Sequence, residues 1–315
     1  MTWSVELAAP SGAGQRLLTA LLRGLTWLLF RGGFHPGVGV PTQRRLLRWG
    51  TRLAPVARGV RVAAGELGGV PCEWLLPARD NGWVLLYLHG GAFIVGAPQT
   101  HRNLTSYLAR HGQLRVCALD YRLAPEHPFP AARDDALAAY RALLAQGQPA
   151  ERIVIAGDSA GGNLALVSVL RLRELGLPLP AALVCLSPFS DVSGAHLHAP
   201  AAGDPLLQVA WLEQGAAAYC PAGMDRRDPQ LSPLYAELHG LPPLLVQVGE
   251  DEILLQHSRL LAQRAVAAGV ACRLELYRRQ WHVFQINCGL LAGADQALQR
   301  LLDFLRQRGC PCPLS

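Results

Sequence analysis

One serine of the sequence stands where its hydroxyl could act as a nucleophile, at the centre of the run Gly157-Asp158-Ser159-Ala160-Gly161. The apolar, β-branched residues 153–156 before it predict a buried strand, and residues 162–172 after it have helical spacing. Small neighbours are needed where a strand turns sharply into a helix. The run therefore predicts a nucleophile elbow, with Ser159 at the carboxyl edge of a sheet and near a helix N-terminus. A merely structural glycine-rich turn is the alternative.

A serine hydroxyl needs a base within hydrogen-bond reach, and the base needs a carboxylate to orient it. Among the ten histidines, His282 stands out because it follows a predicted strand at 273–277 and would reach the same sheet edge as Ser159. Three acids, Glu250-Asp251-Glu252, follow the preceding predicted strand, and we expect one of them to be the partner of His282. The order serine, acid, histidine is that of α/β-hydrolases.

Acyl transfer also needs donors aimed at the oxyanion that develops on the substrate. The run His89-Gly90-Gly91-Ala92-Phe93 directly follows a predicted core strand at 84–88. Residues with little or no side chain let the backbone approach a substrate closely and present N–H groups to it. This loop is therefore the candidate oxyanion loop.

The sequence supports a metal or redox site less well than it supports a serine nucleophile. His196-Leu197-His198 has no third ligand at a usable spacing, so we expect neither a metal nor another cofactor. The eight cysteines lack framework spacing, and Cys310-Pro311-Cys312 is too isolated to indicate a redox site. Reduced cysteines suit a cytoplasmic protein.

The composition favours a large buried core and argues against nucleic acid as a partner. Half of the 315 residues are hydrophobic and 17% are charged. The net charge is +6, but the 29 basic residues are all arginine and are spread along the chain. No signal peptide is evident at the N-terminus. The apolar residues 17–30 are interrupted by Arg23 and are too short for a stable membrane span, so we expect them to pack on protein, with an interfacial role left open.

Strand and helix patterns alternate along most of the chain, which predicts an α/β fold with parallel strands and helices on both faces. Residues 1–55 have a helical pattern without a chemical motif, and we interpret them as an N-terminal cap segment. Residues 56–315 form the predicted catalytic domain, which starts with two antiparallel strands. The predicted strands are 60–62, 72–76, 84–88, 116–120, 153–156, 182–186, 244–248 and 273–277; the predicted helices are 103–110, 131–144, 161–175, 206–218, 255–268 and 292–307. A long connection at about 188–225 is interpreted as a cap insertion over the carboxyl edge of the sheet.

Four motifs in order resemble the bacterial hormone-sensitive lipase family of carboxylesterases. They are the loop at 89–93, residues 120–132 (DYRLAPEHPFPAA), the elbow around Ser159, and His282-Val283-Phe284. The resemblance runs from about residue 59 to the C-terminus and implies the α/β-hydrolase fold, a mostly parallel central sheet with a helical cap, and ester hydrolysis without a cofactor.

By matching motif positions, the resemblance implies that Ser159 is the nucleophile, His282 the base and Glu252 the triad acid. It also implies an oxyanion hole from the N–H groups of Gly91, Ala92 and Ala160, with Gly90 shaping the loop. Two departures from the family pattern are Ala92, which replaces a glycine and is expected to narrow the acyl site, and Glu252, which replaces the usual aspartate.

The leading hypothesis is a serine carboxylesterase that hydrolyses small to medium-chain apolar esters through an acyl-enzyme. An amide or lactone hydrolase with the same triad is an alternative. A non-catalytic ligand-binding receptor of the same fold is a third, which the presence of His282 disfavours. The expected partner is a small-molecule ester, and a homodimer is left open.

Overall fold

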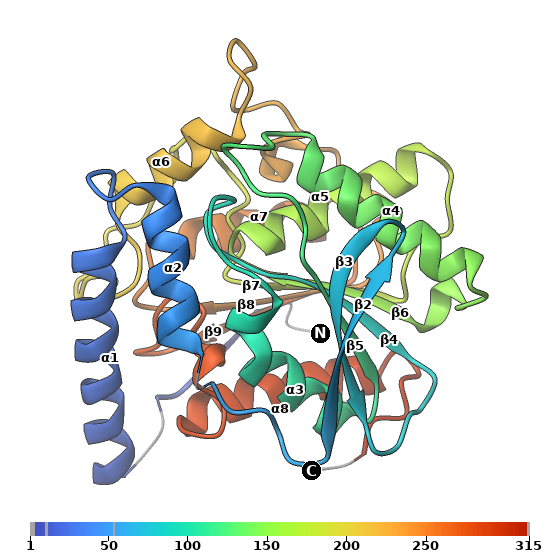
Figure 1. Cartoon of the computed structure of the whole chain (residues 1–315), viewed down its shortest axis with the longest axis horizontal. Helices are drawn as coiled ribbons and strands as arrows, with labels where there is room; N and C mark the ends of the chain where they lie inside the picture. The colour runs from blue at the N-terminus through green and yellow to red at the C-terminus, as the bar shows by residue number, and fades with distance from the viewer. Residues whose placement is uncertain (1–3, 10–11, 53, 314–315) are drawn as a thin grey trace.

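A nine-stranded, mostly parallel sheet forms the centre of the computed structural model, which describes residues 4–9, 12–52 and 54–313 (Figure 1). The strands lie in the order β1-β9-β8-β7-β6-β4-β5-β3-β2. β3 runs antiparallel to its neighbours β2 and β5, and the other paired strands are parallel. The strands are β1 (Ser4–Leu7), β2 (Val60–Leu67), β3 (Val70–Pro77), β4 (Val84–Leu88), β5 (Arg115–Leu119), β6 (Ile153–Asp158), β7 (Ala182–Leu186), β8 (Leu244–Gly249) and β9 (Cys272–Tyr277).

Helices cover both faces of this sheet. α4, α5 and α7 contribute to the hydrophobic core on one face, and α3 and α8 to the core on the other. The α-helices are α1 (Ala13–Gly33), α2 (Val40–Thr51), α3 (Arg102–Gly112), α4 (Ala131–Ala145), α5 (Ala160–Glu174), α6 (Val209–Tyr219), α7 (Leu255–Ala267) and α8 (Ala292–Arg306). Short 3₁₀ helices lie at η1 (Pro98–His101), η2 (Ala150–Arg152), η3 (Pro233–Tyr235) and η4 (Phe284–Asn287).

The central strand β4 shows why an apolar run becomes a strand here. All five of its side chains are buried. Val84, Leu86 and Leu88 point into one core, while Leu85 and Tyr87 point into the other. Because successive side chains of a strand alternate between faces, a strand covered on both sides must be apolar throughout.

The predicted α/β-hydrolase fold is confirmed, and the main difference from prediction is at the N-terminus. The helical pattern of residues 1–55 gave no sign of a strand, yet β1 pairs in parallel with β9 at the sheet edge. A four-residue edge strand with partly exposed side chains has too short a pattern to be told from a loop. Its pairing partner lies more than 260 residues away, so the local sequence carries no sign of it.

The long connection after β7 contains α6, which begins at Val209 and not at the predicted 206. The side chain of Asp204 accepts hydrogen bonds from the backbone N–H groups of Leu206 and Leu207, at 2.9 and 3.0 Å. These bonds stabilise a turn at residues 204–207 where the first helical turn was predicted. The aspartate side chain accepts from backbone N–H groups and so competes with helix formation.

The N-terminal helices α1 and α2 lie side by side at the left edge of the view in Figure 1. Leu18 and Leu22 of α1 pack against the core formed with α3 and α8, whereas Leu17, Leu21 and Leu25 of the same apolar run are exposed. The expectation that residues 17–30 pack on protein is therefore met for one side of the helix only. Within the described ranges, no helix is both long enough and apolar enough to cross a membrane.

Candidate active site

Ser159 occupies a sharp turn between β6 and α5. Its φ and ψ angles are 52° and −117°, a conformation that side-chain-bearing residues rarely adopt. The turn is possible because glycines flank it: a Cβ at Gly161 would lie 1.9 Å from the carbonyl oxygen of Leu88, and one at Gly157 would lie 2.3 Å from the carbonyl oxygen of Gly161. These close approaches require glycine, so the geometry is that of the predicted elbow.

Ser159 and His282 line the same pocket, which has a volume of about 200 Å³. The floor of the pocket comes from the ends of strands and the loops that follow them, and its walls come from α1, α2, the segment leading into α6 and the first turn of α6. The residues of these walls are Thr26, Phe30, Leu47, Thr51, Leu206, Leu207 and Trp211. Segments that lie far apart in the sequence thus enclose the serine in mostly apolar surroundings.

His282 and Glu252 lie together behind the serine, and both are buried. Nδ1 of His282 is 3.5 Å from Oε2 of Glu252, which leaves Nε2 as the ring nitrogen available to the serine. Burial raises the pKa of Glu252 despite the nearby imidazole. Burial opposes the charged form of His282, but the adjacent Glu252 carboxylate, with the charges of Asp204 and Asp158, outweighs it and raises the pKa of His282.

Asp251, the neighbouring candidate acid, points away from His282. Its Oδ2 is 3.1 Å from Nη1 of Arg23 on α1, and it lines a different cavity on the outer side of the loop. Glu250 is also directed elsewhere, since its carboxylate accepts a hydrogen bond from the backbone N–H of Arg279. Of the three consecutive acids, Glu252 is therefore the one that the fold brings to His282.

Two residues that the sequence patterns did not single out hold this pair in place. Ser187, after β7, donates a hydrogen bond from Oγ to Oε2 of Glu252 at 2.8 Å and accepts one from the N–H of Val283 at 3.3 Å. Asp204 accepts a hydrogen bond from the N–H of Ile253, the residue after Glu252, at 3.0 Å. A serine and an aspartate in long loops are common, so no local signal distinguishes them.

The predicted oxyanion loop lies beside Ser159, but its N–H groups are not equivalent. The N–H of Gly90 donates to Oδ1 of Asp158 at 3.0 Å and so is already used. Gly90 therefore shapes the loop and does not supply a free donor. Within the described ranges, no protein acceptor takes the N–H of Gly91, Ala92 or Ala160. Gly91 has a φ of 128°, which only glycine adopts without strain.

The methyl group of Ala92 lies against α6 and not on the pocket wall. A Cβ at Gly215 of α6 would be 2.7 Å from the Cβ of Ala92 and 2.3 Å from its carbonyl oxygen. The described lining of the pocket includes Gly90 and Gly91 but not Ala92. The expectation that Ala92 narrows the acyl site is therefore not supported, because Gly215 makes room for the methyl group.

Asp158 anchors the base of the site, a role that sequence reasoning missed. Its carboxylate is buried and accepts hydrogen bonds from Oη of Tyr87 at 2.7 Å and from the N–H of Gly90, with Nε2 of His101 3.4 Å away. Burial alone would raise the pKa of Asp158, but the charge of the nearby His101 and the hydrogen bond from the hydroxyl of Tyr87 lower it. The residue before the nucleophile thus ties the elbow to the oxyanion loop.

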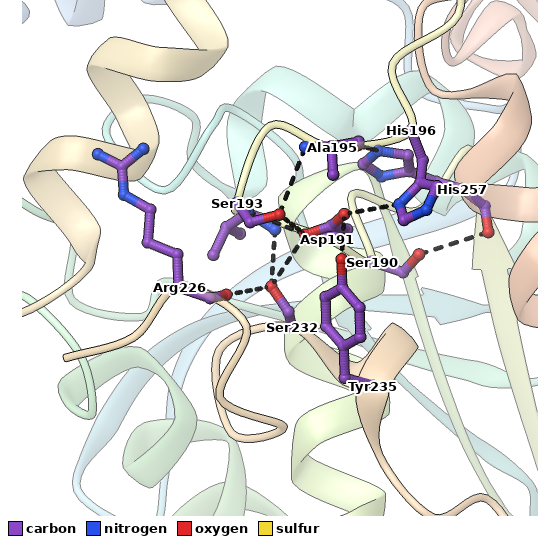
Figure 2. Close-up of polar contacts among 10 residues, drawn as sticks. Ser190, Asp191, Ser193, Ala195, His196, Arg226, Ser232, Tyr235 and His257 are labelled. Carbon is purple, nitrogen blue, oxygen red and sulfur yellow. Dashed lines mark hydrogen bonds and ion pairs between the residues drawn. The ribbon is translucent and has the colours of Figure 1, made fainter.

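Asp191 organises the start of the cap insertion (Figure 2). Its buried carboxylate accepts hydrogen bonds from the N–H and Oγ of Ser193 and from Oη of Tyr235, and it contacts Nδ1 of His196 at 3.2 Å. Burial would raise its pKa, but the hydrogen bonds from Ser193 and His196 lower it. His196, one of the two histidines of the His196-Leu197-His198 pair, belongs to this network. Across the described part of the chain, no group of three or more potential metal ligands occurs.

Known proteins resemble this chain over most of its length. A family model described as the alpha/beta hydrolase fold matches residues 85–286. An acetyl-hydrolase from Streptomyces hygroscopicus is 45% identical over 242 residues, which cover 76% of this chain and 81% of that protein. An esterase from Acinetobacter venetianus is 38% identical over 255 residues, covering 80% and 84%. The solved structure of a hormone-sensitive lipase from a metagenome library superposes with a TM-score of 0.86 at 40% identity, covering 93% of this chain and 99% of that one.

Proposed function

Because the chain belongs to the bacterial hormone-sensitive lipase family of carboxylesterases, and is a serine hydrolase of carboxylic esters, we propose that Ser159, His282 and Glu252 carry out its reaction. The observation that carries this proposal is the shared pocket of Ser159 and His282, with the buried Glu252 carboxylate 3.5 Å from Nδ1 of His282. No cofactor takes part in the proposed steps.

The reaction proceeds in two halves. Oγ of Ser159 attacks the ester carbonyl carbon while Nε2 of His282 takes its proton, and the imidazolium is stabilised by Glu252. The tetrahedral oxyanion accepts hydrogen bonds from the N–H groups of Gly91, Ala92 and Ala160. The alcohol leaves with the proton from His282. Water then attacks the acyl-enzyme with the same base and releases the acid.

The proposed substrates are esters of small to medium acyl chain length. A pocket of about 200 Å³ is below the 300–1,000 Å³ of typical drug-sized sites, and its walls include Phe30, Leu47 and Trp211. The name of the relative from Streptomyces hygroscopicus, an acetyl-hydrolase, also favours a short acyl group. We propose that, within the segment 1–55, the pocket-facing sides of α1 and α2 act together with the insertion at 188–225 as the cap that encloses this substrate, while β1 belongs to the sheet.

A panel of p-nitrophenyl esters tests the chain-length proposal. We expect kcat/KM to be highest for acyl chains of up to about eight carbons and to fall for longer ones, since an extra methylene gains only about 1–3 kcal/mol before steric exclusion begins. Amides and lactones with the same acyl groups, assayed in parallel, should be poorer substrates. Faster turnover of long-chain triglycerides than of butyrate esters would contradict the proposed pocket.

The pH dependence of kcat/KM tests the role of His282. Only the neutral imidazole can accept the Ser159 proton, so kcat/KM should fall as the pH decreases through the pKa of His282. Because that pKa is raised, the midpoint of the fall should lie above about 6.5, the ordinary value for histidine. Thermal unfolding measured across the same pH range separates titration from denaturation. A midpoint below the ordinary value in a protein that stays folded would argue against a Glu252-supported base.

We also propose that the enzyme works in the cytoplasm. The support is that all eight cysteines are free thiols, and seven of them are buried. A reducing compartment maintains free thiols. Fractionation of the producing cells would test this proposal.

A further inference from the structure

The outer side of α1 and α2 exposes an unusual amount of apolar surface. Of the twelve exposed large hydrophobic side chains in the described part of the chain, eight lie on these two helices. Leu17, Leu21, Leu25 and Leu28 follow one another along one face of α1 and are each 54–64% exposed. Trp49 of α2 is 78% exposed. Monomeric proteins seldom leave a continuous apolar face to water without a function for it.

Arginine accompanies this apolar surface. Between residues 7 and 65 the sequence has nine arginines and no acidic residue. Arg23 and Arg44 pair with Asp251 and Glu126 of other elements. Arg16 on α1 and Arg45, Arg48 and Arg52 at α2 are exposed, and none of these four has an ion-pair partner among the residues that the structure describes. Arg45, Arg48 and Arg52 share the helix face of Trp49, because their spacing follows the helical repeat.

The same two helices form the wall between this surface and the candidate active site. An apolar groove between α1 and α2 is lined by Leu28, Leu29 and Leu46, and it shares Phe30, Leu47 and Thr51 with the pocket of Ser159. In Figure 1, none of the drawn elements lies on the outer side of α1. A partner seated on the exposed surface would therefore contact the same two helices that line the pocket.

We propose that α1 and α2 bind the surface of an anionic lipid bilayer. Exposed amphipathic helices that carry leucine or tryptophan together with arginine have the composition of interfacial membrane-binding segments. The leucines would enter the boundary between headgroups and acyl chains, and the arginines would contact the lipid phosphates, with which guanidinium groups form bidentate hydrogen bonds. The enzyme would then hold its pocket beside esters that partition into the membrane.

The distribution of charge favours a lipid surface over a second copy of the chain. A symmetric dimer places the same patch of both subunits face to face. Here that would bring Arg45, Arg48 and Arg52 of each copy close to the same arginines of the other, in a segment without an acidic residue to offset them. An anionic bilayer supplies the missing negative charge.

Co-sedimentation of the full chain with vesicles tests the proposal without using the reaction. The protein should bind vesicles of phosphatidylcholine with about 30% phosphatidylglycerol, bind pure phosphatidylcholine much less, and release in about 0.5 M NaCl because salt screens the attraction. Arg45→Gln, Arg48→Gln and Arg52→Gln combined should weaken binding on the order of 100-fold, since each arginine near an anionic surface contributes roughly a five-fold factor. Leu21→Ser, Leu25→Ser and Leu28→Ser combined should also weaken binding by at least about tenfold.

Matched controls separate this surface from general charge and apolarity. Arg141→Gln on α4 and Leu175→Ser after α5 change exposed residues far from α1 in the sequence and should leave binding unchanged. Turnover of soluble p-nitrophenyl butyrate should stay within about twofold in the arginine variant, so a loss of lipid binding is distinguishable from a failure of the esterase site. Absence of binding to the anionic vesicles, equal binding by the arginine variant, or a stable dimer that the leucine substitutions dissociate would overturn the proposal.

Discussion

Ser159→Ala is expected to lower kcat by about 10⁴–10⁶-fold, to the residual level that binding and the oxyanion hole alone provide. The physical reason is that the variant has no oxygen to form the acyl-enzyme, while His282 and Glu252 stay in place. The fold should not change. In the structure the backbone of Ser159 carries its contacts: its N–H donates to the carbonyl of Leu186 at 2.9 Å, and its own carbonyl accepts from the N–H of Phe189 at 2.9 Å. Alanine keeps both.

The measurement is single-turnover and steady-state hydrolysis of a soluble ester by the purified variant, together with its thermal unfolding midpoint. Ser168→Ala is a matched control, since Ser168 is a buried serine further along α5 whose hydroxyl has no partner among the described residues. It should retain wild-type activity. In addition, a serine-directed inhibitor should label the wild type at Ser159 and leave Ser159→Ala unmodified. Near-normal turnover in a folded Ser159→Ala variant would refute the proposed nucleophile.

Features of the site that depend on local spacing could be predicted from the sequence. The elbow needs a strand, a serine among small residues and a helix in direct succession, and all three lie within about twenty residues. Only glycine fits at positions 157 and 161, because the backbone passes so close there that a Cβ would clash with a carbonyl oxygen. The strands β4 and β7 have their predicted bounds because both are buried on two faces and are apolar along their whole length. Tertiary packing reinforces the local pattern in these places.

Contacts between distant segments could not be predicted in this way. Ser187 reaches Glu252 across 65 residues, and Asp158 reaches Gly90 across 68, and neither pairing leaves a repeat or a spacing in the sequence. Which N–H groups of the oxyanion loop stay free to bind the oxyanion likewise depends on the position of the Asp158 carboxylate, which takes the N–H of Gly90. The exposed side of α1 is a different case. A run of leucines at helical spacing predicts a buried helix face. Only the packed structure shows that Leu17, Leu21 and Leu25 are exposed.

Glu252→Gln should lower kcat by about 10²–10⁴-fold, by analogy with acid-to-amide changes in other triads. The amide keeps the shape of the side chain but removes the negative charge beside Nδ1 of His282, and so no longer stabilises the imidazolium. Folding should tolerate the change, because burial raises the pKa of Glu252 and a neutral group is easier to bury there than a carboxylate. The kinetic loss should therefore appear in kcat without a comparable fall in the thermal unfolding midpoint.

Asp251→Asn is the matched control, one position away and with the same change of group. Asp251 faces Arg23 and the outer cavity, so its amide should keep kcat within about tenfold of the wild type, a difference of no more than ~1.4 kcal/mol in the barrier. Comparing Glu252→Gln with Asp251→Asn also distinguishes a catalytic role from a structural role for an acid in this loop. A purely structural acid would lower stability in proportion to activity, whereas the proposed triad acid lowers activity alone. If Asp251→Asn were the slower enzyme, the acid would have to be reassigned to Asp251, and the loop would have to turn its carboxylate inward during the reaction.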